Sequence, residues 1–234
     1  MFGIRLNPLV ASLATVLFLT ATVPASAQNL AKLQEVVDQA RTTFNSFLSE
    51  PNFTWFRDHI KDARAILIIP RQVKAGFILA GSGGSGVALA RDGQTGSWSQ
   101  PAFYTMGAGS IGLQVGGAVS QVILIFMTDR GRDALLSTKV QLGADIKVAA
   151  GPVGAGAQAA TTDVLSFARS KGFFGGISVE GAVIEQRNSW NDLYYEKPVR
   201  AVDILIRRNV SNMKADSLVS TVTRATSVRR KRPL

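Results

Sequence analysis

Apolar residues recur every three or four positions between residues 29 and 48, and charged residues occupy positions between them. Leu33, Val37 and Phe44 belong to this apolar series. Such spacing places the apolar side chains along one side of a helix, so the pattern predicts an amphipathic α-helix over 29–48. A second, shorter helix is expected over 53–62. We expect the first helix to pack on the core of its own domain rather than to lie on a membrane.

After residue 64 the pattern changes to short apolar runs and to alternation of apolar with polar or glycine residues. The run 65–69 is wholly apolar and ends at Pro70, which predicts a buried strand. Further along, Ile146 and Val148 alternate with Lys147. Period-two alternation in successive short strands predicts an antiparallel sheet with one face on a core. The expected strands are 65–69, 76–80, 86–90, 110–119, 121–127, 142–149, 155–160, 164–168 and 177–185.

Glycine is frequent within and beside these strands. Inside a strand it marks bends, bulges and close approach of two backbones, so we expect a strongly coiled sheet that approaches a barrel. Short helices are expected at 128–136, where Thr128 is a suitable N-cap, and at 198–207 and 211–225. The predicted fold class is therefore α+β. It combines a glycine-rich, mainly antiparallel sheet with amphipathic N-terminal helices and short C-terminal helices.

The first residues read as a secretory signal peptide. Arg5 supplies a positive charge, residues 8–20 are mainly apolar, and Ala25 and Ala27 precede an expected cut before Gln28. The alternative is an anchor that stays in the membrane, but the apolar stretch is shorter than the roughly 20 residues that span a bilayer. We therefore expect an exported protein, periplasmic or secreted. Its expected parts are a signal peptide (1–27), one domain (28–208), and a C-terminal helix with a basic tail (209–234).

The composition limits which interactions can stabilise this domain. The chain has no cysteine, which excludes disulfides, a catalytic thiol, a cysteine metal site and a lipidated cysteine after the cut. With 46% hydrophobic and 18% charged residues, it has enough apolar side chains for a sizeable core. The fold must therefore be held by that core.

The formal net charge is +10, and Arg5 is the only charged residue before residue 28. Removal of 1–27 leaves 25 basic and 16 acidic residues, a net charge of +9. Much of this excess lies near the C-terminus, so the body of the domain is only mildly basic. A short basic tail is typically solvated and is suited to an anionic membrane surface, and we expect no nucleic-acid partner. The tail residues are Arg224, Arg229, Arg230, Lys231 and Arg232.

Few residues suggest catalysis. Residues 81–86 match G-x-G-x-x-G, but strand-like residues follow where a nucleotide site needs a helix, so we interpret the segment as a glycine-rich hairpin. His59 is the only histidine and lies among charged residues, as expected for a surface side chain. Asp145 and Glu180 would form a carboxylate pair if their strands adjoined, although pairing with basic neighbours is the simpler alternative. We predict no enzyme activity, metal or cofactor.

Several motifs in this order resemble the SYLF domain, across roughly residues 30–206. The resemblance is carried by the segments 65–70, 74–77, 98–104, 110–116, 142–145, 150–154 and 170–181. It implies a lipid-binding module without enzyme activity. Eukaryotic members bind phosphoinositides, and some bind actin beside an attached SH3 or FYVE domain. This chain looks more like a secreted bacterial branch, so actin and phosphoinositides are not expected partners; a general anionic phospholipid is.

The resemblance also implies candidate contact residues. Family members are thought to meet membranes through an N-terminal amphipathic helix with basic residues. Here that region contains Lys32, Arg41, Arg57, Lys61 and Arg64. The alternative is the polar face of the sheet, which would carry Lys147, Arg169, Lys171 and Arg187.

Two functions remain open on the sequence. The first is a noncatalytic exported protein that binds anionic lipid or a membrane surface. The second is an envelope structural or interaction protein whose basic tail contacts polyanions or a protein partner. The oligomeric state stays open.

Overall fold

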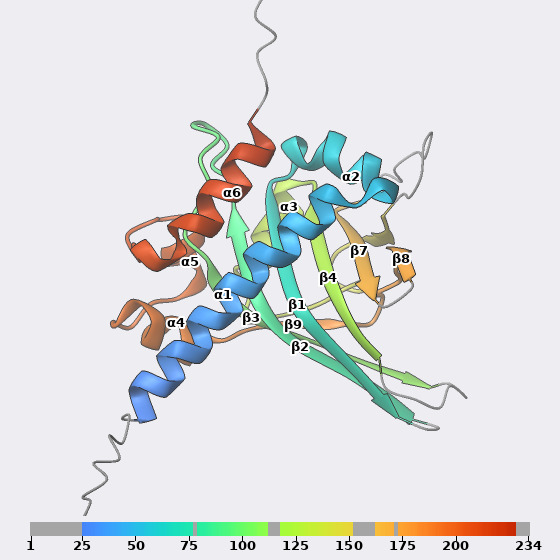
Figure 1. Ribbon diagram of the computed structural model, residues 1–234, viewed down its shortest axis with the longest axis horizontal. Coiled ribbons are helices and arrows are strands. Elements are labelled where there is room, and N and C mark those ends of the chain that lie inside the picture. Colours follow the sequence, from blue (N-terminus) through green and yellow to red (C-terminus); the bar gives the residue numbers. More distant parts are fainter. Residues whose placement is uncertain (1–24, 77–78, 112–117, 152–161, 171–172, 228–234) are drawn as a thin grey trace, which may run out of the picture.

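The computed structural model describes residues 25–76, 79–111, 118–151, 162–170 and 173–227 (Figure 1). Its helices are α1 (Ala25–Ser49), α2 (Thr54–His59), α3 (Asp129–Ala134), α4 (Asn188–Tyr195), α5 (Ala201–Leu205) and α6 (Asp216–Thr226). Three single-turn 3₁₀ helices are η1 (Pro51–Phe53), η2 (Ile60–Asp62) and η3 (Met213–Ala215). The strands are β1 (Ala65–Gly76), β2 (Leu79–Ala90), β3 (Ala102–Ile111), β4 (Ala118–Phe126), β5 (Lys139–Gln141), β6 (Val148–Ala150), β7 (Val164–Ser170), β8 (Phe173–Gly176) and β9 (Val183–Gln186).

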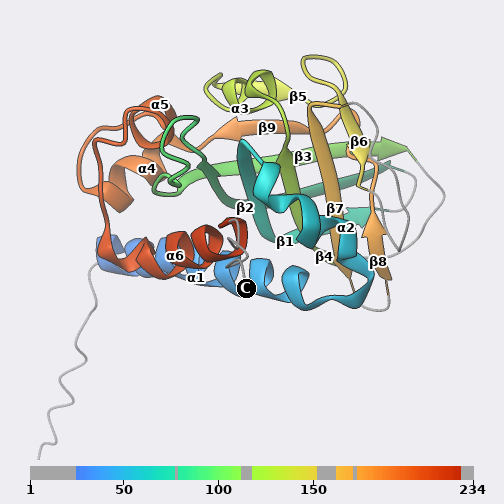
Figure 2. The same ribbon diagram turned by 90° about the horizontal axis from the view of Figure 1, so that it is seen from above.

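These strands form one curled sheet in the order β5-β9-β3-β2-β1-β4-β7-β6, with β8 also paired to β7. The pairings are antiparallel, apart from the parallel contact of β6 with β7. In Figure 2, α1 and α6 lie side by side across one side of the sheet, while α3 lies on the other. The α+β class, the coiled antiparallel sheet and the helices at both ends of the domain are therefore confirmed.

Helix α1 covers the sheet through the apolar side that its sequence pattern predicts. Leu33, Val37, Phe44 and Phe47 are buried along it. Beyond its end, Phe47 stacks on Phe53 of η1 with ring centroids 5.0 Å apart. Helix α1 thus joins a larger aromatic cluster that roots the N-terminal helices on the sheet. Further members are Trp55 and Phe56 of α2 and Phe167 of β7.

Strand β1 does not end at Pro70, as the sequence predicted, but continues to Gly76. The register against β2 shifts between Ile68 and Arg71, and the register against β4 shifts between Ile69 and Gln72. This irregularity is a bulge, and it includes Pro70, which has no N–H to contribute to a ladder. The bulge lets one long strand bend while it stays in the sheet.

The glycine-rich segment 81–86 lies inside β2, so the predicted hairpin turn and the separate strands 76–80 and 86–90 are wrong. Two of its glycines face the bulge of β1. A Cβ at Gly86 would lie 1.9 Å from the Ile68 carbonyl oxygen, and one at Gly84 would lie 2.5 Å from the Arg71 carbonyl oxygen. Glycine is needed there because two backbones approach more closely than any side chain allows.

Other strand predictions were wrong in their limits. The predicted strand 142–149 is interrupted by a turn at Gly143, whose φ is +89°. The predicted strand 177–185 begins as a loop and becomes β9 only at Val183. The sequence prediction also missed most of β3 and the whole of α4.

The three helices predicted at 128–136, 198–207 and 211–225 are confirmed in outline. Helix α3 begins after Thr128, whose Oγ1 accepts a hydrogen bond from the Gly131 N–H. Helices α5 and α6 lie within the predicted segments, apart from the last residue of α6. The expected strand 155–160 lies outside the described residues, as do residues 1–24 of the expected signal peptide. Within the described ranges, no helix is both long and apolar enough to cross a membrane.

Candidate binding surfaces

The basic residues predicted on the N-terminal helices do not share one surface. Lys32 and Arg41 are nine positions apart, about two and a half turns, so they project from opposite sides of α1. The Nε atom of Arg41 is buried, and no hydrogen-bond partner is found for it among the described residues. Arg57 is held locally: its guanidinium donates to Thr54 Oγ1 at 3.1 Å and to the Glu50 carbonyl oxygen. Helix α1 therefore does not present a continuous basic stripe.

Lys61 and Arg64 are exposed near the start of β1. Acidic residues surround them: Arg64 Nε lies 3.8 Å from an Asp129 carboxylate oxygen, and Asp58 and Asp62 are also exposed in this region. Charges of both signs are thus mixed here. Such a surface attracts an anionic bilayer less than a purely basic one of the same size.

The alternative set on the sheet is also dispersed. Arg187 follows β9 and Arg169 lies in β7, and four strands separate β9 from β7 in the sheet. Arg187 lies over the Trp190 ring, with its guanidinium carbon 4.5 Å from the ring centroid. Lys147 is exposed in the segment before β6, and Lys171 lies outside the described residues. The three described residues, Lys147, Arg169 and Arg187, do not converge on one headgroup-sized site.

Of the basic tail, the structure describes Arg224, which is exposed on α6. Arg229, Arg230, Lys231 and Arg232 lie outside the described residues. In Figure 1, the end of α6 lies close to α2. Arg224 and Lys61 therefore belong to the same end of the molecule.

A hollow of about 760 Å³ runs along α1. Its lining combines Glu35 and Asp38 with Lys214 and with apolar side chains such as Leu30. Thr43 also lines it, and the buried Thr43 hydroxyl has no hydrogen-bond partner among the described groups. Among the described residues that line it, the hollow therefore gathers no cluster of basic groups that would hold a lipid phosphate.

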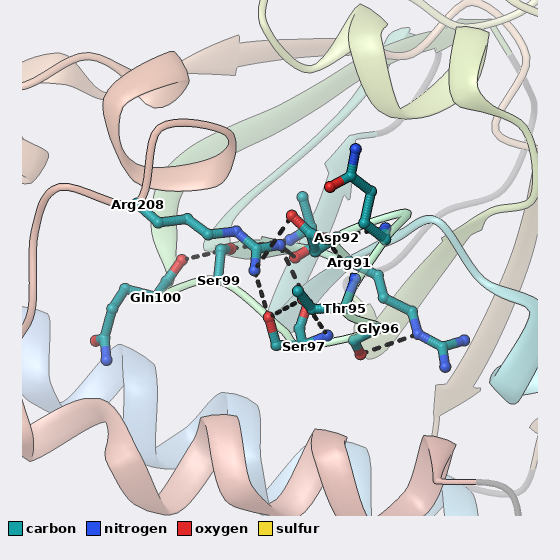
Figure 3. A network of polar contacts seen from close by, with 10 residues as sticks. Arg91, Asp92, Thr95, Gly96, Ser97, Ser99, Gln100 and Arg208 are labelled. Atoms are coloured by element: carbon teal, nitrogen blue, oxygen red, sulfur yellow. Dashed lines mark hydrogen bonds and ion pairs between the residues drawn. The ribbon is translucent and has the colours of Figure 1, made fainter.

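The most connected polar cluster is one that sequence reasoning missed (Figure 3). Arg208 follows α5, and its guanidinium donates to Ser97 Oγ at 2.6 Å, to the Ser97 carbonyl oxygen at 3.1 Å and to the Ala90 carbonyl oxygen at 3.3 Å. It also lies 3.8 Å from an Asp92 carboxylate oxygen. Arg208 thereby fixes the β2–β3 loop to the C-terminal helices.

This loop is ordered by its own short contacts as well. Asp92 Oδ1 accepts hydrogen bonds from the backbone N–H groups of Thr95 and Gln94, which hold the pKa of Asp92 below its usual value. The Trp98 indole N–H donates to Thr226 Oγ1 of α6 at 2.7 Å. The sequence signal for this cluster is faint, because its partners are more than 100 positions apart. Its role is to join two parts of the fold.

The candidate catalytic groups are held in local contacts. The His59 ring stacks on Trp55 with centroids 4.2 Å apart. Asp145 and Glu180 lie in turns rather than in adjoining strands, and Asp145 Oδ2 accepts a hydrogen bond from the Gln141 N–H at 2.6 Å. Among the described residues, no group of three or more potential metal ligands is brought together.

The curled antiparallel sheet and its helical cover define an α+β domain. The chain belongs to the Ysc84 family, described as Las17-binding protein actin regulators, whose match covers residues 107–225. The resemblance to SYLF domains is thereby confirmed.

Individual relatives agree with this assignment. SH3 domain-containing YSC84-like protein 1 of Bos taurus is 34% identical over 145 residues, covering 59% of this chain and 42% of the relative. LAS seventeen-binding protein 3 of Saccharomyces cerevisiae is 35% identical over 162 residues, 64% of this chain and 34% of the relative. Protein YSC84 of the same yeast is 32% identical over 177 residues, 70% of this chain and 37% of the relative. The chain thus spans less than half the length of these relatives.

Proposed function

We propose that this chain is a noncatalytic, exported protein that binds anionic lipid at a membrane surface through its SYLF-like domain. The observation that carries the proposal is the charge of the long central strands. Within the described strands β1 to β4 the charged residues are Arg71 and Lys74, and both are basic. Such an excess attracts an anionic bilayer and is weakened by salt.

The noncatalytic part of the proposal rests on the packing of the candidate groups. His59 is stacked against Trp55, and the two carboxylates considered as a pair are in turns. The family description also names binding and regulation rather than a reaction. These observations favour a binding domain.

Export is proposed from the N-terminal sequence. Arg5, the apolar stretch that follows it, and Ala25 and Ala27 form the three parts of a signal peptide. A cut before Gln28 would remove three residues from the start of α1. The rest of α1, including its buried apolar side, would remain.

Co-sedimentation of the chain lacking residues 1–27 with vesicles tests lipid binding. Vesicles of phosphatidylcholine alone should leave the protein in the supernatant, and vesicles with 30–40% phosphatidylglycerol should pellet it. Raising the salt from about 0.05 M to 0.5 M should reverse the pelleting, because the screening length falls severalfold. Equal pelleting with both vesicle types at both salt concentrations would exclude binding by charge.

A second candidate, an interaction with a protein partner, is favoured by the family description, which names Las17 binding and actin regulation. High-speed co-sedimentation with actin filaments tests it directly. Export predicts no requirement for actin, so we expect the protein to stay in the supernatant. Pelleting with filaments, together with no binding to anionic vesicles, would favour this second function.

A further inference from the structure

The ends of β1 and β4 extend beyond the helical cover, at the lower right of Figure 1. Four side chains at this strand end define what we name the distal surface: Arg71, Val73 and Val119 on the helix-covered face of the sheet, and Lys74 on its opposite face. Val73 and Val119 are 40% and 52% exposed, unusually high for valines inside a sheet. They are directly paired across β1 and β4, so their side chains are neighbours and form one apolar spot.

The bulge of β1 determines which side chains belong to this spot. Without it, strict alternation from buried Ile68 would place Gln72 and Lys74 on the helix-covered face. The extra residue reverses the phase, so that Arg71 and Val73 share that face instead. Gln72 is then buried, at 7% exposure, while Arg71 and Val73 are exposed at the strand end.

The strand positions beside the valine pair are glycines, which have no side chains. Val73 is paired with Gly83 of β2, and Gly83 is paired with Gly107 of β3. A Cβ at Gly83 would meet nothing within 4 Å, so packing inside the protein does not require glycine there. The absence of side chains at these two positions leaves the paired valines as the raised apolar feature of this face.

The charge at this strand end has one sign. Arg71 is exposed on the face of Val73, and Lys74, exposed at the next position, projects from the opposite face of the same strand end. Among the described residues of the distal halves of β1 to β4, none is acidic. The end of the molecule with Lys61 and Arg64 instead contains Asp58, Asp62 and Asp129 among its exposed residues.

From this combination we infer that the distal surface is the part of the molecule that contacts an anionic bilayer. The basic side chains would meet lipid phosphates while Val73 and Val119 enter the interfacial region. The inference rests on the proposed lipid-binding function and specifies its site. It differs from the expectation that the N-terminal helix makes the contact.

Two double variants test the two components of the surface. Arg71→Gln with Lys74→Gln removes two charges and should weaken partitioning onto phosphatidylglycerol-containing vesicles roughly 30-fold. Val73→Ser with Val119→Ser removes the apolar spot and should weaken it roughly 10-fold. The first variant should lose most of the salt dependence, and the second should retain it.

Each variant has a matched control. Lys61→Gln with Arg224→Gln removes two charges from the opposite end, and Ile206→Ser with Met213→Ser removes two exposed apolar side chains, 40% and 85% exposed, outside the sheet. Both controls should bind within about twofold of the unchanged chain. Circular dichroism and melting temperature must show that every variant is folded.

The outcomes separate the site from the function. If the unchanged chain binds anionic vesicles and the Lys61/Arg224 variant loses binding while the distal variants keep it, the distal surface is wrong and the lipid function stands. If the unchanged chain does not bind, the proposed function itself fails. If the unchanged chain is a dimer in sedimentation velocity and the valine variant is a monomer, the spot is a self-association surface and the inference is overturned.

Discussion

Two residues of β2 show how tightly the backbone pairing constrains individual positions. Gly86 and Gly84 face the bulge of β1, where carbonyl oxygens of Ile68 and Arg71 occupy the space of a Cβ. Gly83, in the same strand, faces open space. Close backbone packing therefore requires glycine at Gly84 and Gly86 but not at Gly83. Substitution by alanine should reveal this difference.

We predict that Gly86→Ala lowers the stability by roughly 3 kcal/mol, at the upper end of the cost of overpacking, because the obstacle is backbone and cannot rotate away. The melting temperature should fall by roughly 6–12 °C. Gly83→Ala is the matched control and should change it by no more than about 2 °C. Differential scanning calorimetry measures both, and equal melting temperatures for the two variants would show that the bulge relaxes freely.

Asp163 is a residue whose hydrogen-bond partners determine its pKa. Its carboxylate accepts a hydrogen bond from Thr128 Oγ1 at 2.7 Å and one from the Lys147 N–H at 3.2 Å. The Thr128 hydroxyl contributes most to lowering the pKa of Asp163, followed by the Lys147 N–H. The carboxylate thus joins the start of α3 to the segment before β6.

A lowered pKa implies that Asp163 stabilises the fold fully above the unfolded value of about 3.9, and that this contribution is lost as the pH falls through the lower folded value. Asp163→Asn should be less stable by about 1–2 kcal/mol at pH 7. The difference should shrink below pH 4. Urea unfolding at pH 7, 5 and 3 measures it, with Asp133→Asn, an exposed carboxylate of α3, as the control. A difference that is constant from pH 7 to pH 3 would contradict the assignment.

At the scale of elements, local periodicity predicted those helices and strands whose apolar residues repeat at a regular spacing. Helix α1 was found because Leu33, Val37 and Phe44 repeat at helical spacing over almost its whole length. Strand β2 was not, because its residues 81–86 are all glycine or serine, which usually mark turns. Its strand conformation depends on β1 and β3, which pair with it on both sides.

The candidate surfaces show the same limit. The sequence identifies exposed basic residues, but their grouping depends on strand order and on the bulge of β1. Lys147, Arg169 and Arg187 were expected on one polar face and lie apart. Arg71 and Val73 were not considered, because the strand was expected to end at Pro70. A bulge has no periodic signature, so neither the continuation nor the reversal of phase was predictable.

The connection between the β2–β3 loop and the C-terminal helices gives the prediction at this scale. Arg208→Lys keeps the charge and the left-handed backbone, whose φ is 54°, and loses the planar group that reaches Ser97 and Ala90 together. We expect a loss of about 2 kcal/mol in unfolding free energy and faster proteolysis within the loop.

The neighbouring Arg207→Lys is the matched control. Its ion pair with Asp203 is at the surface, and the Arg207 side chain is 61% exposed, so the substitution should cost less than about 0.5 kcal/mol. Urea unfolding and limited proteolysis of both variants provide the comparison. If the two lose equal stability, Arg208 does not fix the loop.

At the scale of the whole molecule, the two ends differ in how acidic and basic residues are distributed. Acidic and basic residues mix at the end where α2 and α6 approach each other, whereas the distal ends of β1 to β4 contain basic residues without acidic ones in their described parts. A net charge of +10 does not distinguish these two ends. Under the proposed function, the orientation of the domain at a membrane depends on this asymmetry.

The proposed export would determine which membrane the domain meets, and it can be tested on the unaltered chain. Expressed with its own N-terminus in a Gram-negative host, the protein should be recovered from the periplasmic fraction with a mass that corresponds to residues 28–234. A large residue at the last position before the cut blocks cleavage, so Ala27→Phe should leave the full-length chain in the membrane fraction. Gln28→Phe is the control on the other side of the cut and should still be processed. Full-length protein in the cytoplasm would remove the export proposal, and partners such as actin would then become accessible to this domain.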